Sequence, residues 1–315
     1  MAVIPLRVLF AGTPPVAVPA LRSVVESEHV VVGVLTKPDA RAGRGRRMQA
    51  SAVSQAAREL HVPVHTPHSL VDSGNEIAEM IASERIDVVA VVAYGLLVPD
   101  DLLDIPRFGW VNVHFSALPR WRGAAPVQHA IANGDEQIAI TTFRIDAGLD
   151  TGPVLLRSPD IAIEPREDAG HLLERLAPIG ADLLVDTLDA LATGAVHPSP
   201  QSTEGASLAP SLSTDHARID WRHPAREVDN RIRGCTPAPG AWTTVDGARL
   251  RIGVPAAVHV DASATPGKLV IDKRAVKVGA QGGFVELGLV QPHGGKQMPA
   301  ADWARGLRTA DPSVE

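Results

Sequence analysis

The segment from Ile86 to Ala93 constrains the fold of this chain more than any other. Every residue in it except Asp87 is apolar, and most are valine or isoleucine. A strand in the interior of a parallel sheet is covered on both faces and therefore needs such an uninterrupted apolar run. The segment predicts a central strand of a parallel sheet.

The neighbouring sequence indicates the same class of fold. Similar apolar runs occupy residues 6–11 and 30–35, and residues 110–114 form a further expected strand. They alternate with helical patterns at 51–60 and 168–192, as in repeated strand–helix–strand units. We expect an α/β, Rossmann-like domain with a mostly parallel sheet, and we expect Pro178 to kink or split the 168–192 helix.

The last third of the chain has a different character. Residues 193–214 are rich in Ser, Pro, Gly and Ala and show no periodicity, which is typical of an interdomain linker. Beyond them, short apolar segments are separated by turns, and Asp246-Gly247 is a hairpin signal. The predicted organisation is a catalytic domain at 1–192, a linker at 193–214, and a small OB-like β-barrel domain at 215–315.

The composition narrows the class of protein. The single cysteine, Cys235, excludes an intramolecular disulfide and a zinc site built from cysteines, and we expect no metal. There is no signal-peptide pattern and no apolar run long enough to span a bilayer. We therefore expect a cytoplasmic protein with no membrane partner, and we also expect a monomer.

Charge is distributed unevenly along the chain. The net charge is −6, which argues against a nucleic-acid partner. However, residues 209–315 hold 14 Lys+Arg and 11 Asp+Glu, a balance of 14 − 11 = +3. Residues 37–47 carry five basic side chains against the single Asp39. This segregated positive charge favours an RNA partner.

Three polar residues form a plausible acyl-transfer site. Asn112 and His114 lie at the end of the 110–114 strand, and alternation along a strand places both side chains on one face. Asp150 follows 36 residues after His114, in a glycine-rich turn that also holds Asp146. A carboxylate bonded to His114 would fix its tautomer and raise its pKa, and an amide can donate to a developing oxyanion. Each residue alone is more often structural than catalytic.

These residues lie within motifs that resemble the signature of the folate-dependent formyltransferases. The motifs are Asn112-x-His114, Ser116-Ala117-Leu118-Pro119, the segment from Arg120 to Pro126, and the turn from Asp146 to Gly152. The resemblance implies a formyltransferase domain in which Asn112, His114 and Asp150 are catalytic. Asp146 ranks second to Asp150, as a residue that stabilises the turn.

The resemblance also implies the formyl donor, 10-formyltetrahydrofolate. The segments implied to contact this folate are Ser116, Ala117, Leu118 and Pro119, together with Tyr94, Gly95, Leu96 and Leu97. The family usually has leucine where this chain has Ala117; the smaller side chain offers less apolar contact, and the backbone contacts are kept.

Further segments resemble the members of the family that act on a tRNA. These are Thr36-Lys37-Pro38-Asp39, Ala217 to Trp221, and Gly240-Ala241-Trp242. They imply that the acceptor is the α-amine of methionine esterified to initiator tRNA, which is formylated for translation initiation. The basic residues expected to contact this tRNA are Lys37, Arg41, Arg44, Arg46 and Arg47.

Two other hypotheses remain open. The same chemistry with another amine acceptor, such as glycinamide ribonucleotide or an amino sugar nucleotide, would need neither the arginine-rich segment nor a basic second domain. A non-catalytic RNA-binding protein would use the barrel and the basic segment alone. The three catalytic residue types argue against that reading.

Overall fold

The computed structural model describes residues 4–42, 47–307 and 312–315. The chain divides into two compact units, each built from separate stretches of sequence. The first unit comprises Met1–Gly123, Ala139–Asp160 and Leu173–Leu208. The second comprises Ala124–Ile138, Ile161–Leu172 and Ala209–Glu315.

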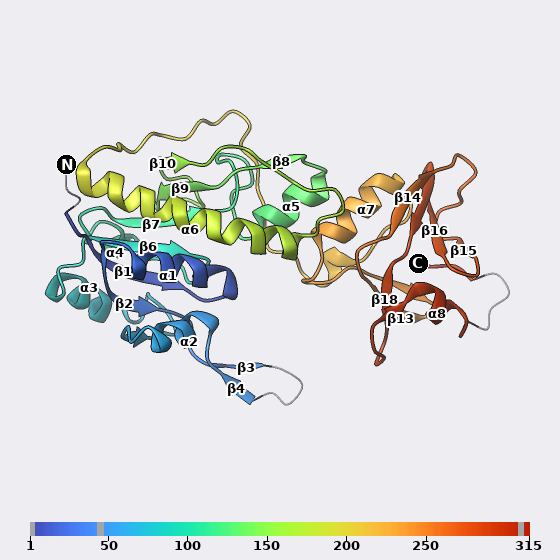
Figure 1. Cartoon of the computed structure of the whole chain (residues 1–315), viewed down its shortest axis with the longest axis horizontal. Helices are drawn as coiled ribbons and strands as arrows, with labels where there is room; N and C mark the ends of the chain where they lie inside the picture. Colours follow the sequence, from blue (N-terminus) through green and yellow to red (C-terminus); the bar gives the residue numbers. More distant parts are fainter. Residues whose placement is uncertain (1–3, 43–46, 308–311) are drawn as a thin grey trace. The chain divides into compact units, whose positions relative to one another are not determined.

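A seven-stranded sheet forms the centre of the first unit, in the order β10-β9-β7-β6-β1-β2-β5 (Figure 1). Its strands are β1 (Arg7–Gly12), β2 (Val30–Leu35), β5 (Val64–His65), β6 (Val88–Val92), β7 (Trp110–His114), β9 (Thr141–Arg144) and β10 (Val154–Arg157). The neighbouring strands β7, β6, β1, β2 and β5 are all parallel to one another. The pairs β7–β9 and β9–β10 are antiparallel. The predicted mostly parallel sheet is confirmed, with β6 buried at every position.

Helices and a small hairpin complete the first unit. They are η1 (Pro15–Ala17), α1 (Val18–Glu26), α2 (Ala52–Glu59), α3 (Gly74–Ser83) and α4 (Asp100–Leu103), with the antiparallel pair β3 (Ala40–Ala42) and β4 (Arg47–Gln49). The sequence patterns did not indicate α1, α3 or this hairpin.

Helix α6 (Ala169–Thr193) packs on β7, which carries Asn112 and His114, and on the neighbouring strand β9. Its Thr187 Oγ1 lies 2.8 Å from Thr142 Oγ1 in β9. A Cβ on Gly180 would lie 3.2 Å from Val113 in β7 and 3.1 Å from Phe115, so glycine allows a close approach of the helix to β7. The helix is not split at Pro178.

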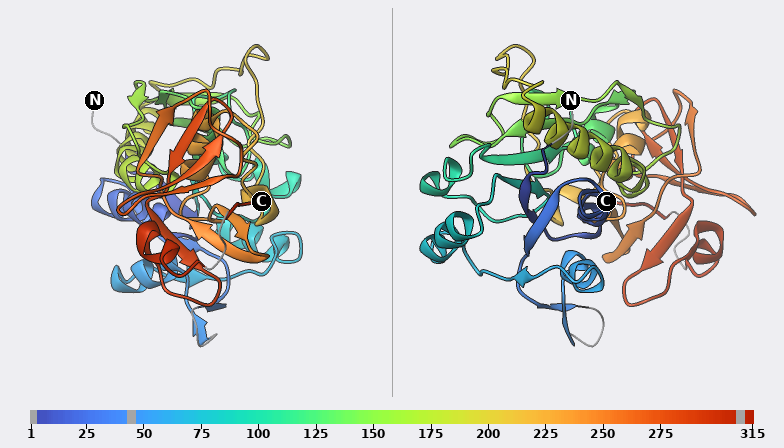
Figure 2. Two further views of the ribbon diagram at one scale, coloured as in Figure 1. Left: turned by 90° about the vertical axis from the view of Figure 1, so that its right-hand side faces the viewer. Right: turned by 60° about the vertical axis from the view of Figure 1, so that its left-hand side comes forward.

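The second unit contains two four-stranded antiparallel sheets, with strands drawn in orange to red in Figure 2. One sheet is β12 (Trp242–Val245), β13 (Ala248–Ile252), β18 (Leu289–Pro292) and β19 (Met298–Pro299). The other is β14 (Ala257–Val260), β17 (Gly283–Glu286), β16 (Val276–Ala280) and β15 (Leu269–Ile271). Leu250 and Val290 of the first sheet share one buried core with Val278 and Val285 of the second.

The remaining elements of the second unit are short. They are α5 (Pro126–Asn133), β8 (Gln137–Ile138), β11 (Ile161–Ala162), η2 (Asp215–Ala217), α7 (Ala225–Gly234) and α8 (Ala300–Ala304). The predicted hairpin between β12 and β13 is confirmed, because Asp246 and Gly247 have φ values of 48° and 74°. Positive φ at both positions is what a two-residue type I′ turn requires.

Residues 199–208, which the sequence predicts to be part of a linker, belong to the first unit. Ser199 exchanges two backbone hydrogen bonds of 2.8 Å with Val154 of β10. The predicted domain boundaries at 192 and 215 remain predictions. No helix in the described part of the chain is long and apolar enough to cross a membrane.

Candidate active site

The predicted site residues gather where parallel strands of the first unit end. Strands β6 and β7 are parallel neighbours, with Val91 paired to Asn112. Tyr94–Leu97 therefore leave the same edge of the sheet as Ser116–Pro119. Ligands of open α/β sheets bind outside this carboxyl edge.

His114 is the last residue of β7, and its ring is buried. The Phe143 ring lies in an edge-to-face arrangement with the imidazole, with the two ring centroids 6.2 Å apart. The imidazole Nε2 lies 2.8 Å from the carbonyl oxygen of Trp121. Because a carbonyl only accepts hydrogen bonds, Nε2 carries the hydrogen and Nδ1 is the basic nitrogen of the neutral ring.

Asp150 faces this basic nitrogen. Its Oδ2 lies 3.7 Å from His114 Nδ1 and accepts a 2.7 Å hydrogen bond from the backbone N–H of Gly123. Asp150 itself has a φ of 50°, in the left-handed region that aspartate tolerates better than most residues. The structure thus brings together the imidazole and the carboxylate that the sequence predicts as partners.

The pKa of His114 differs from the sequence-based expectation. Burial is the largest influence and lowers this pKa, while the nearby Asp150 carboxylate and the Trp121 carbonyl act in the opposite direction. The expected raised pKa is therefore wrong, because desolvation of the imidazolium outweighs the carboxylate. His114 is a neutral imidazole at neutral pH.

Asn112, the third predicted catalytic residue, is half-buried in β7. It stands two residues before His114 and pairs with Val91 on one side and Phe143 on the other. Side chains alternate along a strand, so Asn112 and His114 project from the same face of the sheet. An amide and a buried imidazole are therefore presented together.

The turn that carries Asp150 is held by Asp146 and by a glycine. Asp146 Oδ1 accepts hydrogen bonds from the Gly148 N–H at 3.1 Å and from the Thr151 hydroxyl at 2.8 Å. The predicted turn-stabilising role of Asp146 is confirmed. A Cβ on Gly152 would lie 1.8 Å from the Arg144 carbonyl oxygen, so only glycine fits there.

The loop after β7 is fixed by internal hydrogen bonds. The buried Ser116 hydroxyl donates to the Arg120 carbonyl at 2.6 Å. The Ser116 carbonyl accepts a 2.7 Å hydrogen bond from the Thr141 hydroxyl. The Thr141 hydroxyl oxygen in turn accepts a 3.3 Å hydrogen bond from the Leu118 N–H. Ala117 and Pro119 are half-buried in this loop.

The loop after β6 combines buried and exposed residues. The Tyr94 carbonyl accepts a 2.9 Å hydrogen bond from the Thr13 hydroxyl. The Tyr94 side chain is buried, its hydroxyl meets no hydrogen-bond partner among the described residues, and burial raises its pKa. Gly95 and Leu97 are exposed and Leu96 is half-buried, so the loop presents backbone and an apolar side chain to solvent.

The described residues among the predicted tRNA contacts lie at two different places in the first unit. Arg41 and Arg47 are exposed on the β3–β4 hairpin. Arg44 and Arg46 lie outside the described residues. Lys37 instead lies beside the loop after β6, because its Nζ would be 2.8 Å from a Cβ on Gly95.

Sequence patterns missed the groups that support this site. The Trp121 carbonyl is a backbone group and leaves no trace in residue type. Gln201, whose side chain contacts the turn at Asp150, lies in the segment interpreted as a linker. A composition of Ser, Pro, Gly and Ala carries no periodicity that could have distinguished it.

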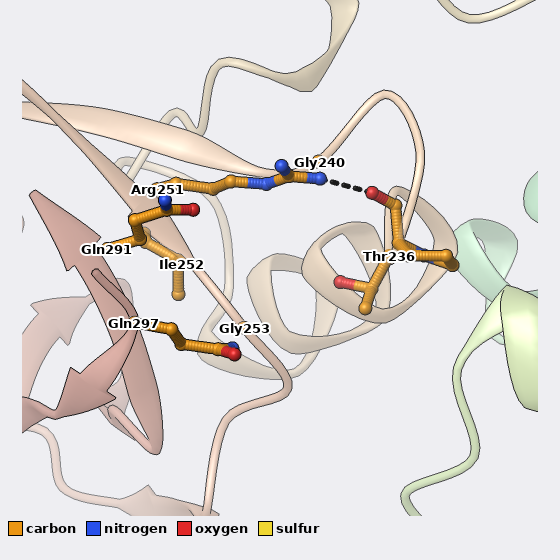
Figure 3. A pocket seen from close by; sticks show the side chains of 8 residues that line it. Thr236, Gly240, Arg251, Ile252, Gly253, Gln291 and Gln297 are labelled. Carbon is orange, nitrogen blue, oxygen red and sulfur yellow. Dashed lines mark hydrogen bonds between the residues drawn. The ribbon is translucent and has the colours of Figure 1, made fainter. Parts of the chain in front are cut away.

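The second unit holds a separate cavity of about 240 Å³. Its lining residues are Thr236, Pro237, Gly240, Arg251, Ile252, Gly253, Gln291 and Gln297 (Figure 3). The Arg251 guanidinium donates to the Pro237 carbonyl at its edge. No described site residue lines this cavity. Within the described residues, no three His, Cys, Asp or Glu side chains are grouped in a way that could hold a metal ion.

The chain is similar over nearly its whole length to known proteins. A methionyl-tRNA formyltransferase of a Nocardioides species is 52% identical over 307 residues, covering 96% of each chain. The methionyl-tRNA formyltransferase of Thermobifida fusca is 51% identical over 306 residues, covering 97% of this chain and 98% of the relative.

A solved structure shares the fold at much lower identity. The N-formyltransferase of Helicobacter canadensis, crystallised with folinic acid and dTDP-3-aminofucose, superposes with a TM-score of 0.67 at 15% identity. The match covers 93% of this chain and all of that one.

Family models account for most of the chain. The model described as formyl transferase matches residues 6–188, and the model described as formyl transferase, C-terminal domain, matches residues 211–308. The resemblance inferred from the sequence motifs is thereby confirmed, and the chain belongs to the formyl transferase family.

Proposed function

We propose that this protein transfers the formyl group of 10-formyltetrahydrofolate to the α-amine of methionine esterified to initiator tRNA, giving N-formylmethionyl-tRNA. The observation that carries the proposal is the 3.7 Å approach of Asp150 to the basic nitrogen of His114, at the carboxyl end of β7. The names of relatives about half identical to this chain support the acceptor.

His114 acts as the general base. Its lowered pKa keeps the imidazole neutral, and Nδ1 accepts a proton from the attacking amine. Once protonated, Nδ1 carries a positive charge opposite the Asp150 carboxylate, which stabilises that charge. The hydrogen bond from Nε2–H to Trp121 holds the ring in the tautomer that this role needs.

Asn112 acts on the formyl oxygen. The amine nitrogen bonds to the formyl carbon, and the Asn112 amide donates to the oxyanion that develops on the carbonyl. The carbon–nitrogen bond to the donor then breaks, and the proton on His114 passes to the leaving nitrogen. Tetrahydrofolate and the formylated amine are released.

The folate donor fits the two loops after β6 and β7. It supplies an activated formyl group when bound. Tyr94, Gly95, Leu96 and Leu97 offer a buried hydroxyl with an unfilled hydrogen bond, exposed backbone and an exposed leucine. Ser116, Ala117, Leu118 and Pro119 offer a loop pre-organised by Thr141.

Positive charge supports a tRNA as the carrier of the amine. Arg41 and Arg47 stand exposed on the β3–β4 hairpin, where their guanidinium groups are free to meet phosphates. The residues from 209 onward carry a net +3, against −9 for residues 1–208, which hold 16 Lys+Arg and 25 Asp+Glu. Lys37, Arg44 and Arg46 complete the proposed basic segment.

The finer organisation is part of the same proposal. We assign residues 1–192 to the catalytic domain, 193–214 to a linker whose residues 199–208 pack with the first unit, and 215–315 to a tRNA-binding domain of the OB type. The protein is proposed to act as a monomer in the cytoplasm.

Single-turnover formylation tests this function. The protein is mixed with 10-formyltetrahydrofolate and either charged initiator tRNA, charged elongator tRNA, uncharged tRNA or free methionine. Formyl transfer to charged initiator tRNA in preference to the others is expected. Transfer to glycinamide ribonucleotide or to an amino sugar nucleotide without tRNA would replace the proposed acceptor, and tRNA binding without any transfer would replace the enzyme.

A further inference from the structure

Residues 199–208, which we call the strap, are hydrogen-bonded at one end to strand β10 and at the other to the loop after β7. At one end, Ser199 pairs with Val154 of β10. At the other, Ser207 Oγ accepts a 2.9 Å hydrogen bond from Trp121 N–H, and the Ser207 carbonyl accepts one of 2.8 Å from Arg122 N–H. The strap is therefore part of the site's framework.

Gln201 makes the most extensive side-chain contacts of the strap. Its Nε2 donates to the carbonyls of Asp150 at 2.9 Å and Gly152 at 2.7 Å. Its Oε1 accepts from Arg122 Nε at 3.0 Å and from Arg122 Nη2 at 2.7 Å. Both amide hydrogens and both lone pairs of the oxygen are thus used.

These contacts close a ring around the catalytic pair. The Trp121 carbonyl holds His114 Nε2, and the adjacent Arg122 side chain is held by Gln201. Gln201 in turn holds the backbone of Asp150, whose Oδ2 returns to the Gly123 N–H. The segment that fixes the imidazole and the turn that carries the carboxylate are thus connected through one amide.

We propose that Gln201 is a positioning residue that sets the separation between Asp150 and His114. Asp150 has a positive φ, a conformation that surrounding contacts must maintain. The two bonds from Gln201 reach the carbonyls on either side of Thr151, so they fix this part of the turn. The assignment rests on the proposed function, since a positioning role has meaning only for a working His114–Asp150 pair.

Two substitutions of Gln201 distinguish the role of its amide N–H groups from that of its amide oxygen. Gln201→Leu removes all four hydrogen bonds at similar side-chain size. Gln201→Glu keeps the acceptors for Arg122 but cannot donate to the carbonyls of Asp150 and Gly152 at neutral pH. Gln55→Leu is the matched control, because Gln55 lies in the same unit and donates one hydrogen bond to a backbone carbonyl, that of Ala50.

The kinetic test uses the full chain. A displacement of this kind costs about 10- to 100-fold in kcat. We expect that loss in both Gln201 variants, with KM for each substrate within about twofold of the wild-type value, because ground-state binding is untouched. Gln55→Leu is expected to match the wild type. Wild-type kcat in Gln201→Glu, with the turn left without its donor, would overturn the proposal.

A second measurement does not depend on activity. Asp150 raises the pKa of His114 against the larger effect of burial, so loosening Asp150 lowers that pKa further. NMR titration of ¹⁵N-labelled histidine, with His114 assigned by a His114→Gln variant, is expected to show this downward shift in both Gln201 variants. An unchanged His114 titration in folded variants rejects the positioning role, whereas a wild-type protein that does not formylate charged initiator tRNA rejects only the function.

Discussion

The carboxylate of Asp150 lies 3.7 Å from Nδ1 of His114, while the other ring nitrogen is already bonded to the Trp121 carbonyl. The imidazole is thus oriented by a backbone group rather than by the acid. The carboxylate instead stabilises the positive charge that the ring gains when Nδ1 is protonated. Substitutions of His114 and of Asp150 are therefore expected to have different effects.

Replacing His114 removes the base. We expect His114→Ala to lose about 10²–10⁴ in kcat, the usual contribution of general base catalysis, while tRNA affinity is retained. His171→Ala is the matched control, since its Nδ1 also meets a carboxylate, Asp168, at 2.9 Å. Steady-state kinetics and tRNA binding check both, and unchanged turnover in His114→Ala would remove it from the site.

Replacing Asp150 alters the pH dependence. Activity requires neutral His114, so kcat rises with pH through the pKa of this residue and is flat above it. Asp150→Asn deletes the charge that raises this pKa, so the acid limb is expected to move to lower pH while the plateau falls. Asp146→Asn, in the same turn, should leave the position of the limb unchanged. A limb that moves upward contradicts the assignment.

Asn112 is expected to act on the transition state alone. Asn112→Ala should lower kcat by about 10²–10³, as the loss of one oxyanion donor does, with little change in either KM. Asn133→Ala is the control variant, because this asparagine lies in helix α5 and not in the sheet that carries Asn112. A change confined to KM would mean that Asn112 binds substrate instead.

The hairpin arginines are expected to contribute long-range charge. Arg41→Glu combined with Arg47→Glu should raise KM for tRNA and reduce the slope of log affinity against log salt by roughly one per lost phosphate contact. Arg58→Glu combined with Arg85→Glu, two other exposed arginines, makes the same change in net charge and is the control. Equal effects of the two changes would mean that only total charge matters.

Gly152 is expected to tolerate no side chain. Its Cβ position coincides with the Arg144 carbonyl, so Gly152→Ala must displace the turn that carries Asp150. We expect a loss of about 1–3 kcal/mol in the free energy of unfolding, measured by urea denaturation, together with reduced kcat. Gly74→Ala provides a contrast, because a Cβ on that glycine would meet no atom within 4 Å and, as at Gly152, the backbone is outside the positive-φ region.

The sequence predicted those parts of the structure that periodicity encodes. Strand β6 is continuously apolar, with four valines and Ala90, and α6 has one apolar face, so both were predicted close to their observed bounds. His114 and Asp150 were paired through motifs, and the fold then brought them together. By contrast, Trp121 acts through its backbone and Gln201 through a segment without pattern.

The expectation that the pKa of His114 would be raised was wrong for a physical reason. Its direction depends on how completely the ring is desolvated, which is set by Phe143 and by the loop that returns from Trp121. These neighbours come from other parts of the chain. A motif identifies the charged partner of a histidine but not the burial that opposes it.

The strap also determines where this chain is free to vary. Between its anchors at Gln201 and Ser207, the five residues from Ser202 to Ala206 are all exposed. The span must bridge two fixed points, so its minimum length is constrained while its composition is not. Because closing a longer loop adds only about 0.6 kcal/mol per doubling, insertions there are expected to be nearly neutral, whereas deletions would pull on the turn at Asp150.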